Sequence, residues 1–462
     1  MTGQSARTRQ GADTIARTRP QLDTRLDTRA IWAIAIPAML TNVATALIGI
    51  GDIWIVGRLG DVAAQGAVDI GARLFAVLFT VMNFLKTGTT GLVAQDGTRS
   101  GAAEQATTLL RGLAIGLAIA LVLLAMKPVL LAFALHALGA QGDVLVAART
   151  YAEIRYWTAP AVMLNLALVG FLVGQRRMTA VLVFEVTYNL LNVGLGLWFV
   201  LDLQWGIAGI GWSSFIAEYA KLALVGLFVF RGDMLRHVRD AVTQRAVLRW
   251  AALKPFLSVN RDLFLRTLVL TVALASLTRL SAERGDVVLA ANGILYQMFI
   301  LTALLLDGFE NAAQVLNGER FGAKDGRGFA GYVRAILSRG MGMAAIVALG
   351  FALFADPLLA SFAATPAVAQ EASAMAVWLV VIPFAGLAGF VLDGVFVGAS
   401  WTRGLLLTML GSVLVFVASL YLTWPIGNHG LWLSFTLFLA VRAGFQLAYL
   451  SRRFPQAFPA PR

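Results

Sequence analysis

Asp52 is the residue with the clearest potential for chemistry. It is a carboxylate inside the hydrophobic run Ala30–Val56, which exceeds the about 20 apolar residues needed to cross a bilayer. An ionised aspartate there costs roughly 2.5–3.5 kcal/mol on insertion scales. The residues that share its helix face are polar or small, namely Asn42, Thr45 and Gly49. We interpret Asp52 as part of an ion or substrate site; the alternative is an aspartate near a helix end, since Arg58 follows closely.

The elements that must position Asp52 are hydrophobic helices. Of the 462 residues, 59% are hydrophobic and 13% are charged, whereas soluble domains carry about 25% charged residues. The composition therefore excludes an ordinary soluble globular protein and indicates an all-α polytopic membrane protein. Twelve hydrophobic runs predict twelve transmembrane helices, near residues 31–56, 68–93, 106–135, 150–173, 179–201, 206–230, 253–278, 287–316, 335–362, 372–398, 404–424 and 430–450.

The loop charges predict the orientation of these helices. With the N-terminus inside, the loops assigned to the cytoplasm carry 23 Lys and Arg residues, and the opposite loops carry four. This excess predicts a multi-pass protein of the cell (inner or plasma) membrane, with both termini cytoplasmic. The basic residues are spread over many loops and form no single patch, so we expect the lipid bilayer and not nucleic acid as the large partner.

Internal similarity predicts two lobes of six helices each. Pro160…Gly170–Gly174 resembles Pro383…Gly394–Gly398, Trp212–Phe215 resembles Trp432–Phe435, and Lys86 and Asp307 each follow a leucine, all at offsets of 220 to 224 residues. Because six is even, the halves enter the membrane in the same sense and are related by pseudo-two-fold symmetry, with a cavity between them. The predicted parts are a disordered basic tail (1–29), an N-lobe (30–230), a cytoplasmic linker (231–252), a C-lobe (253–450) and a second tail (451–462).

Further charged residues lie inside the predicted spans. Spacing favours local pairs between Glu218 and Lys221 and between Asp262 and Arg266. Asp307 and Asp393 have no local partner, so a functional role and pairing between helices both remain open for them. The residues expected to line a central cavity or contact substrate are Asn42, Thr45, Lys86, Arg261, Arg266, Asp307, Glu310 and Asp393.

Several kinds of enzyme site are absent from the sequence. The chain has no cysteine and only three scattered histidines, so we expect neither a metal site nor thiol chemistry. It contains no P-loop, H-E-x-x-H or G-x-S-x-G motif. We therefore expect no cofactor and no enzyme activity. A transporter without its own nucleotide site would draw on an ion gradient.

The ordered motifs of the chain resemble a known family. The chain is similar to the MATE family of multidrug and toxin extrusion transporters, and specifically to its DinF branch. The resemblance runs through all twelve spans and omits only the tails. Its carriers are Gly51-Asp-Ile-Trp-Ile-Val-Gly57, Gly88-Thr-Thr-Gly-Leu-Val-Ala-Gln95, Val259-Asn-Arg-Asp-Leu-Phe-Leu-Arg-Thr267, Leu306-Asp-Gly-Phe309, Leu392-Asp-Gly-Val-Phe-Val-Gly-Ala399 and Gly427-Asn-His-Gly-Leu-Trp432.

The resemblance implies two lobes that open alternately and export substrates in exchange for H⁺ or Na⁺. It places Asp52 in an N-lobe cation site. In many relatives that site also uses an Asn and an Asp on span five and a Thr on span six, where this chain has Asn192, Gly196 and Ser214. Asn189 on span five is a further candidate if it converges with Asp52.

These observations predict an antiporter that exports amphipathic organic compounds in exchange for protons. Gly196 supplies no second carboxylate, so a bare Na⁺ at Asp52 would lack oxygen ligands, whereas a desolvated aspartate can take up a proton near neutral pH. Two alternatives remain within transport, namely Na⁺-coupled export and a flippase for lipids or lipid-linked precursors.

Overall fold

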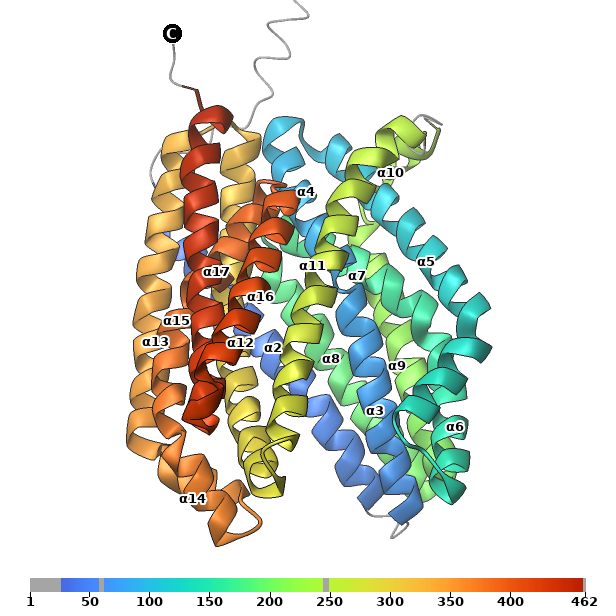
Figure 1. Cartoon of the computed structure of the whole chain (residues 1–462). Helices are drawn as coiled ribbons and strands as arrows, with labels where there is room; N and C mark the ends of the chain where they lie inside the picture. Colours follow the sequence, from blue (N-terminus) through green and yellow to red (C-terminus); the bar gives the residue numbers. More distant parts are fainter. Residues whose placement is uncertain (1–25, 58–61, 244–248, 460–462) are drawn as a thin grey trace, which may run out of the picture.

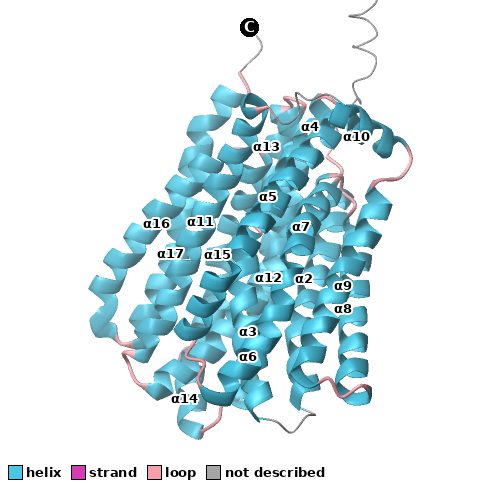
Figure 2. Cartoon of the chain, turned by 90° about the vertical axis from the view of Figure 1, so that its right-hand side faces the viewer, coloured by secondary structure: helices cyan, strands magenta, loops and turns pink. Residues whose placement is uncertain are grey.

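The computed structural model describes residues 26–57, 62–243 and 249–459. Within these ranges, the side chains of residues 46–53, 62, 63 and 252 lie outside the description. The described residues form helices joined by short turns, with no β-strand (Figure 2). The expectation of an all-α membrane protein is confirmed.

Eleven helical segments of the described residues are long and apolar enough to cross a membrane. The 30-residue helix α2 (Thr28–Gly57) is the twelfth span. The other spans are α3 (Val62–Met82) with α4 (Phe84–Arg99), α5 (Ala102–Ala137), α6 (Gly142–Arg155) with η1 (Tyr156–Thr158) and α7 (Ala159–Gly174), α8 (Met178–Leu197) with η2 (Trp198–Asp202), α9 (Gly206–Val229), α11 (Trp250–Ala282), α12 (Asp286–Gly322), α13 (Gly326–Phe362), α15 (Ala376–Gly398), α16 (Thr402–Thr423) with η4 (Trp424–Ile426), and α17 (Asn428–Ala457).

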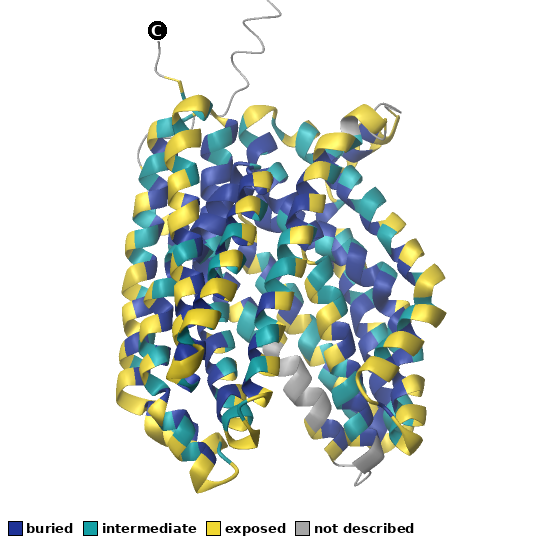
Figure 3. Ribbon diagram, in the orientation of Figure 1, coloured by how far each residue is buried: buried dark blue, intermediate teal, exposed yellow. Residues whose placement is uncertain are grey.

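The spans are arranged as two lobes of six. Helices α2 to α9 form one side of the molecule, and α11 to α17 form the other (Figure 1). Two short helices do not span, namely α10 (Asp233–Thr243) in the linker between the lobes and α14 (Pro366–Ala374). The C-terminus lies at the same end of the bundle as α10 (Figure 1). Buried residues are concentrated in the half of the bundle nearest that end, where the lobes meet (Figure 3).

Glycines repeat one packing arrangement in both lobes. A Cβ added to Gly170 of α7 would lie 2.5 Å from the carbonyl oxygen of Lys86 on α4. The equivalent contact in the C-lobe joins Gly394 of α15 to the carbonyl of Glu310 on α12. Both contacts need glycine, because only a residue without Cβ lets the helix backbones approach so closely. The packing therefore pairs Lys86 with Glu310, 224 residues later, and not with Asp307 as the leucine alignment suggested.

Helix α2 contacts both lobes. Its first half packs on α12, where Gly308 lies against Ala35 and where the rings of Trp32 and Phe309 meet edge to face at 5.5 Å. Its second half packs on α8, where Asn189 donates through Nδ2 to the carbonyl of Ala44 at 2.7 Å. The helix that carries Asp52 therefore begins against the C-lobe and ends within the N-lobe.

The contact at Gly308 can be tested by adding one methyl group. A Cβ at Gly308 would lie 2.6 Å from the carbonyl oxygen of Ala35, so Gly308→Ala should force α2 and α12 apart and destabilise the protein by roughly 1–3 kcal/mol. Gly342 of α13 has nothing within 4 Å of such a Cβ, so Gly342→Ala should stabilise by roughly 0.5–1 kcal/mol through helix propensity. Thermal unfolding in detergent measures both, and shifts of the same sign would contradict the packing argument.

Candidate functional site

Six charged side chains gather where the C-lobe faces α4 of the N-lobe. Three are cationic and three are anionic, so the set, called here the charge cluster, is formally neutral. They interact electrostatically across five helices. The members are Lys86 of α4, Arg266 of α11, Asp307 and Glu310 of α12, Asp393 of α15 and Arg442 of α17.

Asp393 forms the buried centre of the charge cluster. One carboxylate oxygen, Oδ2, accepts from the guanidinium groups of Arg266 and Arg442. The other, Oδ1, accepts from Nε2 of Gln446 at 2.5 Å. The side chain of Asp393 is only 1% exposed, and that of Arg442 is 3% exposed. Buried charges are tolerated where opposite charges and hydrogen bonds compensate their desolvation, and Asp393 has both.

The charge cluster still contains unsatisfied polar atoms. Within the described part of the chain, Nε of Arg266, Nε of Arg442 and Oε1 of Gln446 have no hydrogen-bond partner. Burying such groups without a partner is unfavourable by about 1–3 kcal/mol each. These atoms can therefore bind a polar group or water that enters between the lobes.

Asp307 and Glu310 form the partly exposed side of the charge cluster. They are one helical turn apart on α12, so both project from one face. Lys86 and Arg266 supply positive charge to Asp307, and Lys86 comes from the other lobe. Any motion that separates α4 from α12 therefore changes the charge balance around these two carboxylates.

The N-lobe presents a smaller, uncharged polar set next to α2. Asn192 of α8 is fully buried, and its Oδ1 accepts from the hydroxyl of Ser213 on α9 at 3.0 Å. Nδ2 of Asn192 and the buried hydroxyl of Ser214 have no hydrogen-bond partner among the described residues. A Cβ at Gly196 would meet Ile55 of α2 at 3.0 Å. Asn192, Ser213 and Gly196 thus lie together beside the end of α2.

Asp52 belongs to α2, but its side chain lies outside the described residues. Three other predicted residues lie at or beside this helix. Asn42 donates through Nδ2 to the carbonyl of Leu304 on α12 at 3.1 Å, and Asn189 bonds to the α2 backbone. Thr45 donates to the carbonyl of Thr41 at 2.9 Å within α2 itself. These side chains therefore fix how α2 sits between the lobes.

Two predicted local ion pairs are wrong. Asp262 accepts from the neighbouring Arg261 at 2.8 Å, and Arg266 instead reaches Asp393 on another helix. Arg261 is 66% exposed and lies outside the charge cluster. Lys221 pairs with Glu185 at 2.6 Å, and Glu218 accepts from Nδ2 of Asn165 at 2.7 Å. Partners on neighbouring helices replace the expected partners on the same helix.

Sequence reasoning missed two residues that contact the predicted sets. Gln446 was not singled out, although it lies one turn beyond Arg442 and so shares its helix face. Ser213 was not selected, because the family pattern pointed to Ser214. Arg442 was noted as a charge in the last span but was not among the expected cavity residues.

A set of hydrogen bonds joins the lobes at the end of the bundle that carries the C-terminus. Gln95 donates through Nε2 to the carbonyl of Gly398 and to the hydroxyl of Ser400, both at 2.7 Å. Thr98 donates to the carbonyl of Glu319 at 2.8 Å. We call this contact, made by Gln95, Thr98, Arg176, Glu319 and Ser400, the interlobe seam.

The interlobe seam also contains an ion pair. Arg176, in the turn between α7 and α8, donates through Nε to Oε1 of Glu319 at 2.6 Å. Burial works to lower the pKa of the Arg176 guanidinium, but the hydrogen bond and the charge of Glu319 outweigh it and raise that pKa. The pair is therefore charged at physiological pH, and it ties the N-lobe to the C-lobe.

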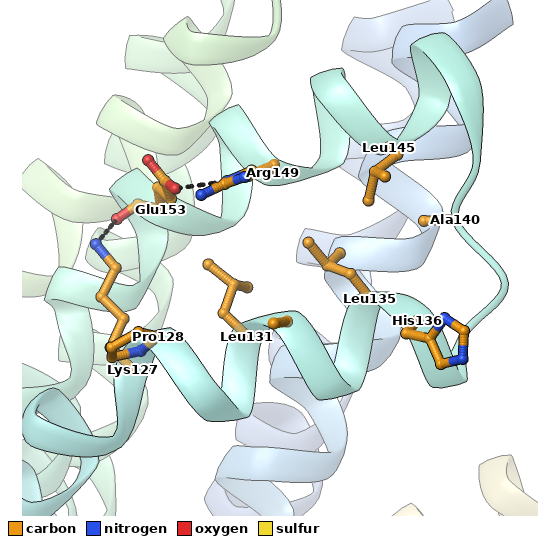
Figure 4. A pocket seen from close by; sticks show the side chains of 10 residues that line it. Lys127, Pro128, Leu131, Leu135, His136, Ala140, Leu145, Arg149 and Glu153 are labelled. Atoms are coloured by element: carbon orange, nitrogen blue, oxygen red, sulfur yellow. Dashed lines mark hydrogen bonds and ion pairs between the residues drawn. The ribbon is translucent and has the colours of Figure 1, made fainter.

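A separate cavity of about 530 Å³ lies between α5 and α6 (Figure 4). Arg149 pairs with Glu153 at 2.9 Å, and Lys127 donates to the carbonyl of Glu153 at 3.2 Å. The remaining lining is mostly apolar, including Leu131, Leu135 and Leu145. None of the predicted site residues lines this cavity, so it is distinct from both polar sets. Among the described residues, no group of three or more His, Cys, Asp or Glu side chains could hold a metal ion.

The role of Asp393 in the charge cluster can be tested by removing its charge. Asp393→Asn should leave Arg266 and Arg442 without their shared counter-charge, and breaking such a buried pair destabilises by about 3–5 kcal/mol. Asp69→Asn is the matched control, because Asp69 also pairs with an arginine but is 48% exposed. Unfolding in detergent compares the variants. Equal stability of Asp393→Asn and wild type would contradict the ion-pair assignment.

Comparisons with known proteins agree with this architecture. The chain matches the MatE family over residues 37–198 and 263–422, one segment in each lobe. It is 32% identical to the DNA damage-inducible protein F of Escherichia coli (strain K12) over 428 residues, covering 92% of each chain. It is 26% identical to the "Probable multidrug resistance protein NorM" of Rhizobium meliloti (strain 1021), covering 87% of this chain and 86% of that one.

Solved structures share the fold. A crystal structure of MATE in the bent conformation superposes with a TM-score of 0.81 at 18% identity, covering 93% of this chain and 96% of that one. The two matched segments start and end at residues that the two-lobe repeat places in equivalent positions. The expected resemblance is confirmed, and the chain belongs to the MatE family of membrane transporters.

Proposed function

We propose that this chain is a secondary antiporter that exports amphipathic organic compounds in exchange for protons, by alternating access of its two lobes. The observation that carries the proposal is the position of α2, which bears Asp52 and packs on both lobes. Gly308 and Leu304 of α12 contact its first half. Asn189 of α8 contacts it further along the chain. A change of charge at Asp52 can therefore alter the balance between the two sets of contacts.

A proton fits the expected N-lobe site better than Na⁺ does. The described residues nearest the end of α2 are Asn192, Ser213 and Gly196, none of which carries a charge. A sodium ion would need several oxygen ligands around Asp52, whereas a proton needs only the carboxylate. The membrane potential adds about 2.3 kcal/mol per charge for each 100 mV, which drives a proton inward.

The charge cluster favours organic substrates over polyanionic lipid precursors. Its three cations are matched by three anions, so the described residues form no strongly basic surface between the lobes. A flippase for lipid-linked phosphates would be expected to place excess positive charge there. Compounds that carry both a cationic or zwitterionic group and an apolar part match this balanced site. The printed name of the Rhizobium relative, a multidrug resistance protein, agrees with this class.

The loop charges support a cell-membrane location with both termini in the cytoplasm. On that assignment the interlobe seam is on the cytoplasmic side, because it lies at the end of the bundle that holds the C-terminus. We infer that the lobes are closed toward the cytoplasm in this conformation and that opening of the interlobe seam admits substrate.

Replacing Asp52 tests proton coupling directly. Purified protein in liposomes should export a cationic dye when a proton gradient alone is imposed, and a sodium gradient alone should be ineffective. Asp52→Asn removes the titrating carboxylate, so proton-driven export should fall to the level of empty liposomes. The measurement is dye flux under each gradient applied separately.

Asp69→Asn serves as the control for this test, since Asp69 is an exposed carboxylate of the neighbouring span and should not affect flux. Thermal unfolding of both variants checks that each is folded. Full proton-driven export by folded Asp52→Asn would rule out Asp52 as the coupling group. Export driven by sodium alone would instead establish the sodium-coupled alternative.

The ion pair of the interlobe seam provides a second test. Glu319→Gln should weaken the closed state by roughly 1 kcal/mol, about a fivefold change in the opening equilibrium, because Arg176 is partly exposed. The chain has no cysteine, so a single Val397→Cys reports on opening. Val397 is 2% exposed and faces Gly91 of the other lobe.

In this background, Glu319→Gln should increase the rate at which a membrane-impermeant maleimide labels Cys from the C-terminal side. Glu104→Gln is the matched control, because Glu104 pairs with Arg111 within the N-lobe alone. If both variants label at the wild-type rate, the ion pair does not hold the lobes together.

A further inference from the structure

A second cavity, of about 320 Å³, lies at the ends of four helices of the N-lobe. Its lining comes from the start of α5, the end of α7, the turn before α8 and the end of α9, and α10 forms one wall. All these segments lie on the side that the loop charges assign to the cytoplasm. The volume is about ten times the roughly 30 Å³ that one water occupies in the liquid, so it can hold a small polar headgroup.

The cavity combines an apolar floor with cationic groups. Phe171, Phe228 and Val229 form apolar lining, and Arg177 and Arg231 stand beside them. The guanidinium of Arg177 lies over the ring of Phe228, 5.6 Å from its centroid. This combination suits a ligand that is anionic at one end and apolar at the other.

The cations of the cavity are not neutralised by the described part of the chain. Neither Arg177 nor Arg231 forms an ion pair there, and Nδ1 of His237 has no hydrogen-bond partner there. The acid in the lining, Asp233, lies 3.6 Å from Arg236, an arginine outside the lining. The cavity therefore has an excess of positive charge that an anion would balance.

Helix α10 has the composition of a helix that lies in the membrane surface. Val238 and Ala241 are buried and lie on the side that packs against α5. Leu235 and Val242, seven residues apart and so on one flank, are 53% and 62% exposed. Trp250, at the start of α11, is 70% exposed. Exposed apolar and aromatic side chains beside arginines are typical of the boundary between headgroups and acyl chains.

We propose that this cavity binds the headgroup of an anionic phospholipid from the cytoplasmic leaflet. Arg177 and Arg231 hold the phosphate, and the apolar floor receives the first carbons of an acyl chain. The exposed flank of α10 keeps the helix at the membrane surface and the cavity open to lipid. A soluble anion would use only the cationic part of this lining, which is why the apolar floor favours a lipid.

Lipid titration of the full-length protein tests the proposal. Delipidated protein in a nonionic detergent should gain thermal stability saturably with phosphatidylglycerol and not with phosphatidylcholine. The double variant Arg177→Gln/Arg231→Gln should bind phosphatidylglycerol about 30-fold more weakly, since each basic residue near an anionic headgroup contributes about one charge interaction. Arg177→Lys/Arg231→Lys keeps both charges and should retain most of the affinity.

The matched control is Arg403→Gln/Arg452→Gln, which removes two exposed arginines on the same side but away from the cavity. It should bind phosphatidylglycerol as wild type does. An equal loss in this control, or equal stabilisation by phosphatidylcholine, would overturn the proposal. A matching response to sn-glycerol 3-phosphate would overturn the lipid assignment and indicate a site for soluble phosphates. Because none of these readouts measures transport, the result is independent of the proposed antiport.

Discussion

Compensation of charge inside the membrane is the constraint on which the rest of the structure depends. A charged side chain in the hydrocarbon core is unfavourable unless a partner of opposite charge lies within the protein. Asp393 satisfies this constraint through Arg266 and Arg442, which come from two other helices. Lys221 and Glu185 do the same in the N-lobe. Each pair joins different spans, so the charges determine which helices must be neighbours.

The two lobes share their backbone packing but not their electrostatics. Gly170 and Gly394 occupy equivalent positions and bring equivalent helices into contact. The residues they contact, Lys86 and Glu310, have opposite charges. The duplicated fold therefore places a cation of one lobe near an anion of the other, and the charge cluster forms across the boundary between them. Shared packing preserved the architecture, and the differing side chains gave each lobe its own chemistry.

The sequence could predict the spans, their orientation and the two lobes, because hydrophobic length and loop charge act through the membrane itself. It could not predict partners between helices. Arg266 was assigned to Asp262, four residues earlier, since local spacing ignores Asp393 on α15. Ser214 was chosen over Ser213, and one residue on a helix turns a side chain by about 100°. Such choices depend on how the helices are rotated, which only packing determines.

The difference between the lobes argues for where coupling occurs. Both oxygens of the Asp393 carboxylate already accept hydrogen bonds, from two guanidinium groups and one amide. A proton could bind there only by displacing one of these donors, at a large energetic disadvantage in a buried site. The described groups beside the end of α2, such as Asn192 and Ser213, are neutral. A titrating acid on α2 meets no such competition, and α2 touches both lobes, so the coupling reaction belongs on the helix that can transmit its effect.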